Sequence, residues 1–198
     1  MPLPRMSNPR RHERPDMTEP MRETEFWAII DATAKFAADP ERQEDELRAA
    51  LRDLSPTEIE AFEMAFQREL QRSYSWDLWG ADYVIHGGAS DDGFQYFQCW
   101  LIAKGSGVFH AALTDPDSLA DVVAEDPDGP LEFEELAYVA SEVWSEKTDL
   151  SVDDPAASYP TSGAFPEQPS GVEFEDSEEH LAARYPKLWA RFGNTPLT

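Results

Sequence analysis

The sequence predicts an all-α fold, an irregular multi-helix bundle with little or no strand. Apolar residues recur three and four positions apart in several stretches, as the buried face of a helix requires. Ser, Asp and Pro stand immediately before many of these stretches, where helix N-termini favour them. Regular alternation of apolar and polar residues, which is typical of a half-buried strand, is missing throughout. A hydrophobic content of 41% over 198 residues is sufficient for the core of one domain.

Composition divides the chain into four parts. Residues 1–20 are rich in Pro and Arg and lack apolar periodicity, which predicts a disordered N-terminal arm, with Met17 as an alternative start. Residues 21–147 contain the periodic stretches and are expected to form the helical domain. Residues 148–176 are acidic and rich in Pro and Ser, which predicts a mobile linker. Residues 177–193 restart a helical pattern, which a proline is expected to interrupt near its middle.

The first helices of the domain are predicted from their N-terminal signals. One is expected from about Thr24, and a second after Asp39, because the proline that follows suits the first helical turn. Ser55 and Glu58 have the spacing of a capping box, also with a proline at the first helical position. This is the strongest local start signal in the chain, and the short breaks favour antiparallel neighbours.

Residues 73–107 combine aromatic mass with clustered polar residues, and the rest of the domain is expected to be organised around them. Ser75 is predicted to cap a helix that runs to about Ile85, where a Gly-Gly pair ends it. Ser90 is predicted to cap the next helix. Short helices are expected beyond this stretch, followed by one continuous helix over residues 131–147.

The run over residues 76–105, WDLWGADYVIHGGASDDGFQYFQCWLIAKG, resembles the signature of a bacterial family called domain of unknown function 4240. Phe26-Trp27 near the start of the domain fits the same family, and so does the helical pattern over residues 132–142. The resemblance covers roughly residues 21–147, and the order of its motifs is specific.

This resemblance implies a helical domain without an assigned activity. Two positions depart from the family pattern, because Ala89 stands where members often carry cysteine and Gln98 where they often carry arginine. The resemblance therefore carries over no mechanism that needs that thiol or that guanidinium.

The charge of the chain excludes some classes of partner. The formal net charge is −24, and such a field repels nucleic-acid phosphates and anionic membrane surfaces. No apolar stretch approaches the length needed to span a membrane. A single cysteine, Cys99, excludes an internal disulfide framework and fits a reducing compartment, so we expect a cytoplasmic protein.

The charge is also unevenly distributed. Over residues 73–183 the only Lys or Arg residues are Lys104 and Lys147, among many Asp and Glu. One interpretation is a solvated acidic surface, and the other is a surface that docks a basic partner or imitates the charge of DNA. Basic residues gather instead near the C-terminus, where the segment would either dock back onto the domain or bind a partner; they are Arg184, Lys187 and Arg191.

The candidate functional site is the corner where the two central helices meet. His86, Asp91 and Asp92 supply an imidazole and two carboxylates, which are adequate for a divalent metal or an acid/base pair. Successive helical residues point about 100° apart, so both carboxylates reach one ion only with help from the loop. The alternative is that these three residues satisfy the two helix ends. The candidate set is Trp76, Asp77, Trp79, His86, Ser90, Asp91 and Asp92.

Two further groups of residues are candidates for a functional site. Cys99 with His86 or His110 would pair a nucleophile with a base, but its apolar neighbours favour an inert, buried thiol. Large aromatic residues would line a ligand pocket, although their helical spacing favours a place in the core. These are Trp76, Trp79, Tyr83, Phe94, Tyr96, Phe97 and Trp100.

Two functions follow from these patterns. The favoured one is a non-enzymatic interaction or regulatory protein that binds a basic partner, because charge is asymmetric and no established catalytic motif is found. The alternative is an enzyme or a small-ligand or metal-binding protein with its site at the corner from His86 to Asp92. No cofactor is expected, and the sequence does not indicate an oligomeric state.

Overall fold

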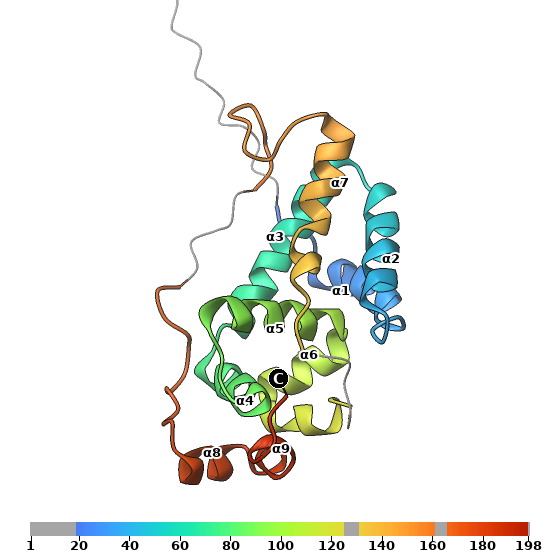
Figure 1. The fold of residues 1–198 in the computed structure, drawn as a ribbon. Helices are drawn as coiled ribbons and strands as arrows, with labels where there is room; N and C mark the ends of the chain where they lie inside the picture. Colours follow the sequence, from blue (N-terminus) through green and yellow to red (C-terminus); the bar gives the residue numbers. More distant parts are fainter. Residues whose placement is uncertain (1–18, 125–130, 161–165, 198) are drawn as a thin grey trace, which may run out of the picture.

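The computed structural model describes residues 19–124, 131–160 and 166–197 (Figure 1). Over these ranges the chain is helical and β structure is limited to one isolated bridge between Ser75 and Ser170, so the all-α prediction is confirmed. The arm predicted over residues 1–20 lies almost wholly outside the described residues. The elements are α1 (Glu23–Ala34), α2 (Pro40–Arg52), α3 (Pro56–Ser73), α4 (Trp76–His86), α5 (Asp91–Ala103), α6 (Ser106–Thr114), the 3₁₀ helices η1 (Pro116–Asp121) and η2 (Glu134–Ala137), α7 (Val139–Thr148), α8 (Glu178–Arg184) and α9 (Pro186–Phe192).

The helices form an irregular bundle around α5. In Figure 1, α2, α3 and α7 lie above α5, and α4, α6, α8 and α9 lie below it. α7 packs against both α2 and α3, whereas α9 packs against α4 and η1. α5 contacts α1, α3, α4, α6 and η2, so it joins the two halves of the molecule.

The predicted N-caps form as the sequence indicates. The Ser55 hydroxyl accepts from the Glu58 backbone N–H at 3.3 Å, and the Glu58 carboxylate accepts from the Ser55 N–H at 2.8 Å. Ser75 caps α4 through the N–H of Leu78, and the Asp39 carboxylate caps α2. These bonds satisfy backbone donors that the first helical turn leaves unpaired.

Buried amide side chains fix α5 against its neighbours. Gln98, which is 1% exposed, donates to the Leu70 carbonyl and to the Ser73 hydroxyl, both at 2.8 Å. Gln43 donates at 2.7 Å to the carbonyl of Ala103, at the other end of α5. A buried polar group without such a partner costs stability, so these bonds favour one position of α5.

The prediction of one continuous helix over residues 131–147 is wrong. Residues 131–133 are not helical, η2 follows, and α7 begins only at Val139. The backbone N–H of Phe133 donates to the Tyr96 carbonyl at 3.1 Å, and that of Leu131 donates to a His86 ring nitrogen. Leu131 and Phe133 are buried while the residue between them is exposed, so bonds to α4 and α5 replace helical ones.

The C-terminal segment lies against the domain. The helical pattern breaks at Tyr185, as Pro186 predicts, and gives α8 and α9. The Asp117 carboxylate, which is 7% exposed, accepts the backbone N–H groups of Lys187 at 3.0 Å and Leu188 at 2.9 Å. Docking of this segment, one of the two interpretations of its basic residues, is therefore the observed arrangement.

Candidate functional site

The candidate corner is the turn between α4 and α5. Gly87 follows the last residue of α4 with φ 68°, in the left-handed region that glycine adopts without a Cβ penalty. A Cβ at this position would lie 2.7 Å from the Pro196 side chain, so the C-terminal tail also requires glycine. Ser90 then caps α5 by accepting from the Gly93 N–H at 3.1 Å. The predicted helix, Gly-Gly turn and helix are therefore confirmed.

A cavity of about 260 Å³ opens at this corner. The end of α4, the turn and the start of α5 form three of its sides, and Glu132 and Leu197 complete it. The backbone N–H of Leu197 donates to the Ile85 carbonyl at 2.8 Å, which holds the tail against the end of α4. The lining residues are Asp82, His86, Gly88, Ala89, Ser90, Gly93, Glu132 and Leu197.

His86 and Asp82 form a buried pair at the cavity. His86 Nδ1 lies 2.6 Å from Asp82 Oδ1, and Asp82 is 1% exposed. His86 Nε2 accepts from the Leu131 N–H at 3.0 Å, so the ring proton belongs to Nδ1 and is donated to Asp82. Burial raises the pKa of Asp82 to about 6; the bond from His86 opposes this shift and the charge of Glu132 adds to it.

This hydrogen bonding restricts the chemistry of His86. Both ring nitrogens are engaged, one with Asp82 and the other with a backbone N–H. The Ser90 hydroxyl is bonded to the N–H of Gly93 and makes no hydrogen bond to the imidazole. A serine nucleophile activated by this histidine is therefore not assembled in this arrangement.

Asp91 and Asp92 lie in the first turn of α5 with exposed side chains and do not line the cavity. Within the described ranges, their carboxylates do not come together with His86 as a group of potential metal ligands. Their position agrees with the capping alternative, since carboxylates are favourable near a helix N-terminus. Metal binding at His86, Asp91 and Asp92 stays a prediction, and it requires movement of these side chains.

The carboxylates that do flank His86 are Asp82 and Glu132, which sequence reasoning did not single out. The spacing of Asp82 and His86, four residues apart on one helix, was a usable signal, because such side chains are neighbours. Glu132 gave no comparable signal, since it approaches the corner only through the break in the predicted helix.

The remaining predicted residues hold neighbouring segments together. Asp77 is exposed and accepts from Arg184 at 2.5 Å, which ties α4 to α8. Trp76 and Trp79 are half-buried and stack with ring centroids 5.5 Å apart. The indole N–H of Trp79 donates to the Ala89 carbonyl at 3.4 Å, so this ring supports one wall of the cavity.

The aromatic residues of the central stretch face one another. Trp79 stacks on Phe94 at 4.8 Å, Phe94 on Phe97 at 6.2 Å, and Phe97 on Trp100 at 5.5 Å. Phe94 and Phe97 are buried, so these rings belong to the core. Cys99 is also buried, which raises the pKa of its thiol to about 12 and keeps it protonated. The inert-thiol interpretation therefore agrees with the structure.

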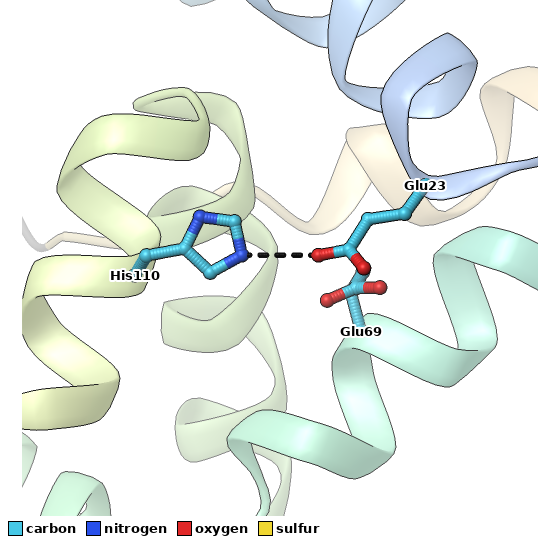
Figure 2. A group of neighbouring side chains, drawn as sticks. All are labelled: Glu23, Glu69 and His110. Atoms are coloured by element: carbon cyan, nitrogen blue, oxygen red, sulfur yellow. Dashed lines mark ion pairs between the residues drawn. The ribbon is translucent and has the colours of Figure 1, made fainter.

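A second cluster of potential ligands lies between α1, α3 and α6 (Figure 2). Atoms of Glu23, Glu69 and His110 come within 4.8 Å of one another, and Glu69 is fully buried. The Arg72 guanidinium lies among them, with Nη1 at 3.0 Å from Glu23, 3.1 Å from Glu69 and 3.4 Å from His110. Arg68 bonds Glu69 from the other side at 2.9 Å. Arginine therefore takes the place that a metal ion would need.

The fold and the corner define an all-helical protein with a His–Asp pair at a small polar cavity. A family model described as a protein of unknown function, DUF4240, matches residues 21–146, well over half of the chain. The chain belongs to this family, which confirms the resemblance. Neither the curated proteins nor the solved structures gave a match. None of the described helices is long and apolar enough to cross a membrane.

Proposed function

We propose that this protein is a non-enzymatic interaction or regulatory protein, and that it binds a basic protein partner through an acidic surface. The surface, here called the α5–η2 surface, consists of Asp91, Asp92, Glu132, Glu134 and Glu135 with Tyr96 and Tyr138. The observation that carries the proposal is that these carboxylates lie together without a Lys or Arg ion-pair partner in the described ranges.

Contacts between α5 and η2 support the continuity of this surface. The Phe133 N–H bonds to the Tyr96 carbonyl, which places η2 beside α5. The Tyr138 hydroxyl donates to Glu134 at 3.0 Å. A hydrogen bond to Glu134 raises the pKa of Tyr96 to about 12, and the charge of Asp92 contributes to this rise. Residues of both elements therefore share one negative field.

Several arginines of the described ranges pair with carboxylates outside this surface. Arg48 and Arg52 pair with glutamates of α7, while Arg68 and Arg72 pair with Glu69. Arg184 pairs with Asp77 of α4. With a formal net charge of −24, uncompensated carboxylates attract positively charged partners over long range and speed their association.

Two tyrosines add exposed aromatic rings to the carboxylates of this surface. Tyr138 is 49% exposed, and Tyr96 is partly exposed beside it. Aromatic faces attract Lys and Arg side chains through cation–π interactions, each worth about 0.5–1 kcal/mol at exposed sites. A surface that combines carboxylates with tyrosines therefore suits a Lys- or Arg-rich protein segment.

Calorimetric titration with a ten-residue arginine-rich peptide tests this proposal. Asp91→Asn/Asp92→Asn/Glu135→Gln removes three charges from the α5–η2 surface. Binding is expected to weaken at least tenfold in this variant, and in the wild type to weaken between low and high salt.

A control variant distinguishes binding at the α5–η2 surface from attraction by the overall negative charge of the chain. Glu41→Gln/Asp45→Asn/Glu46→Gln removes the same three charges from exposed positions of α2. The control is expected to bind the peptide within about threefold of the wild type. Equal losses in the two variants, or no binding by the wild type, would overturn the proposal.

Small-ligand binding at the corner is a second candidate function. The cavity beside the His86–Asp82 pair favours this function, because a pre-formed cavity with a few converging polar groups is typical of ligand sites. Its test is independent of the acidic surface: a ligand bound there is expected to lose affinity in Asp82→Asn but not in Asp92→Asn. Equal effects of these substitutions would contradict binding in the cavity.

A further inference from the structure

We propose that the corner cavity is a binding site for one guanidinium group, an arginine side chain of the basic partner, with Asp82 and Glu132 as its counter-charges. This inference rests on the proposed function and names the side chain that the partner would insert. The cavity, of about 260 Å³, has the size of a small functional group with its methylenes and not of a large ligand.

The Asp82 carboxylate is the buried anchor of the site. Its side chain is 2% exposed and lines the cavity. Oδ1 accepts from His86, whereas Oδ2 has no hydrogen-bond partner within the ranges that the structure describes. This oxygen is therefore free to accept a hydrogen bond, and a cationic donor entering the cavity would supply one.

Glu132 supplies the second carboxylate from another element. A Cβ added at Gly93 would lie 3.7 Å from Glu132 Oε1, so this oxygen approaches the first turn of α5. Both carboxylates line the same cavity, and the charge of Glu132 contributes to the raised pKa of Asp82. The planar guanidinium, with its five donors, matches a pair of carboxylates better than a point charge does.

His86 positions Asp82 without adding charge of its own. Because Nε2 accepts the Leu131 N–H, the imidazole is neutral in this arrangement and does not repel a cation. The Leu197 side chain provides an apolar wall against which arginine methylenes would pack. No Lys or Arg lines the cavity, so within the described ranges no cation of the chain occupies it.

Other ligand classes fit the cavity less well. Two carboxylates disfavour an anion. A divalent metal needs several ligand atoms close together, and the carboxylates and imidazole of this cavity do not form such a group in the described part of the chain. An organic cation bridges a wider separation because its donors are spread over several atoms.

Titration of the full chain with the peptide acetyl-Gly-Arg-Gly-amide, followed by NMR, tests the inference. The Trp79 indole N–H and the backbone N–H groups of Leu131 and Gly93 report on three walls of the cavity. Saturable shifts of these signals are expected, with binding at least tenfold weaker for the isosteric citrulline peptide. Equal affinities for the arginine and citrulline peptides, or no saturable shift, would overturn the inference. Methylguanidinium is a further probe: shifts at the same signals support a guanidinium site, and shifts confined to other signals oppose it.

Glu132 belongs to both the cavity and the α5–η2 surface, whereas Asp92 belongs to the surface alone, so matched variants separate the cavity from the rest of the surface. Glu132→Gln and Asp92→Asn each remove one charge, but only Glu132 lines the cavity. Glu132→Gln is expected to weaken arginine-peptide binding at least tenfold and Asp92→Asn by less than threefold. If both act equally while the ten-residue peptide still binds, the cavity inference fails and the proposed function stands. If that longer peptide does not bind either, the proposed function fails. Thermal unfolding of each variant shows whether it remains folded.

Discussion

His86 Nε2 accepts a hydrogen bond from the backbone N–H of Leu131 at 3.0 Å. This bond joins the end of α4 to a segment that the chain reaches only after α5, α6 and η1. The other ring nitrogen bonds the buried Asp82, so one imidazole satisfies a carboxylate and a backbone donor together. His86, which the sequence indicates as a candidate ligand, therefore also holds the segment at Leu131 beside the cavity.

Substitution of His86 by Ala is expected to destabilise the protein by about 2–4 kcal/mol. It removes both hydrogen bonds and leaves Asp82 buried without a donor, which costs more than the loss of an exposed bond. Urea unfolding followed by circular dichroism measures the change. Gln95→Ala, at an exposed position of α5, is the control and should change stability by less than about 0.5 kcal/mol. Similar effects of the two substitutions would show that the His86 bonds contribute little.

Asp82 makes stability depend on pH. Its pKa is about 6 in the folded protein against 3.8 ordinarily, so it stabilises the fold fully below about pH 4. This contribution is lost as the pH rises through about 6, because ionisation is unfavourable in the buried site. Asp82→Asn removes the titration while keeping an acceptor for His86. The stability of the wild type relative to Asp82→Asn should therefore fall by about 2 kcal/mol from pH 4 to pH 7.

Urea unfolding of the two proteins at pH 4, 5, 6 and 7 measures this difference directly. Some carboxyls have lowered pKa values, such as Glu23 and Glu58. Their contribution to the pH dependence of stability cancels in this comparison, because both proteins contain them. A difference that stays constant over this range would contradict the raised pKa of Asp82.

Gly87→Ala is expected to destabilise the protein by about 1–2 kcal/mol and to displace the C-terminal tail. The positive φ of this residue costs about that much for any residue with a Cβ, and the new Cβ meets Pro196. Gly107→Ala is the matched control, because it lies in α6 and its Cβ meets nothing within 4 Å. That control should be neutral or stabilise by up to about 1 kcal/mol. Equal destabilisation by both would indicate that the tail does not depend on the turn.

The helix starts could be predicted because their causes are local. Ser55, Ser75 and Ser90 each bond a backbone N–H three residues ahead, so a short stretch of sequence contains the whole interaction. The break at Tyr185 before Pro186 is equally local. Such predictions need no knowledge of the tertiary structure.

The composition of the cavity could not be predicted in the same way. Residues 131–133 have the apolar and acidic pattern of a helix start, but their backbone N–H groups bond to His86 and Tyr96 and they are not helical. These bonds exist only once α4 and α5 are packed, and they bring Glu132 to the corner. The Leu197 wall likewise depends on a tail bond to Ile85, which no local pattern indicates.

Divalent ions provide a direct test of the metal hypothesis. After chelator treatment, Mg²⁺, Mn²⁺, Ca²⁺ and Zn²⁺ are expected to shift the thermal midpoint by similar amounts, because they only screen the acidic surface. An ion bound specifically to the native state would raise the midpoint further by mass action. A shift selective for one ion, lost in Asp91→Asn, would support binding at His86, Asp91 and Asp92. A selective shift lost in Glu23→Gln would instead indicate the cluster of Figure 2.

Arg72→Met is expected to destabilise the protein by about 2–3 kcal/mol. Glu69 is fully buried, and Arg72 bonds its carboxylate at 3.1 Å, so removal of the guanidinium leaves a buried charge less compensated. Glu23→Gln should cost less than about 1 kcal/mol, because its side chain is exposed. Urea unfolding measures both changes. In Arg72→Met/Glu69→Gln most of the loss should be recovered, since the uncompensated charge is gone. If this double variant is no more stable than Arg72→Met, the cost arises from lost packing of the arginine and not from the Glu69 charge.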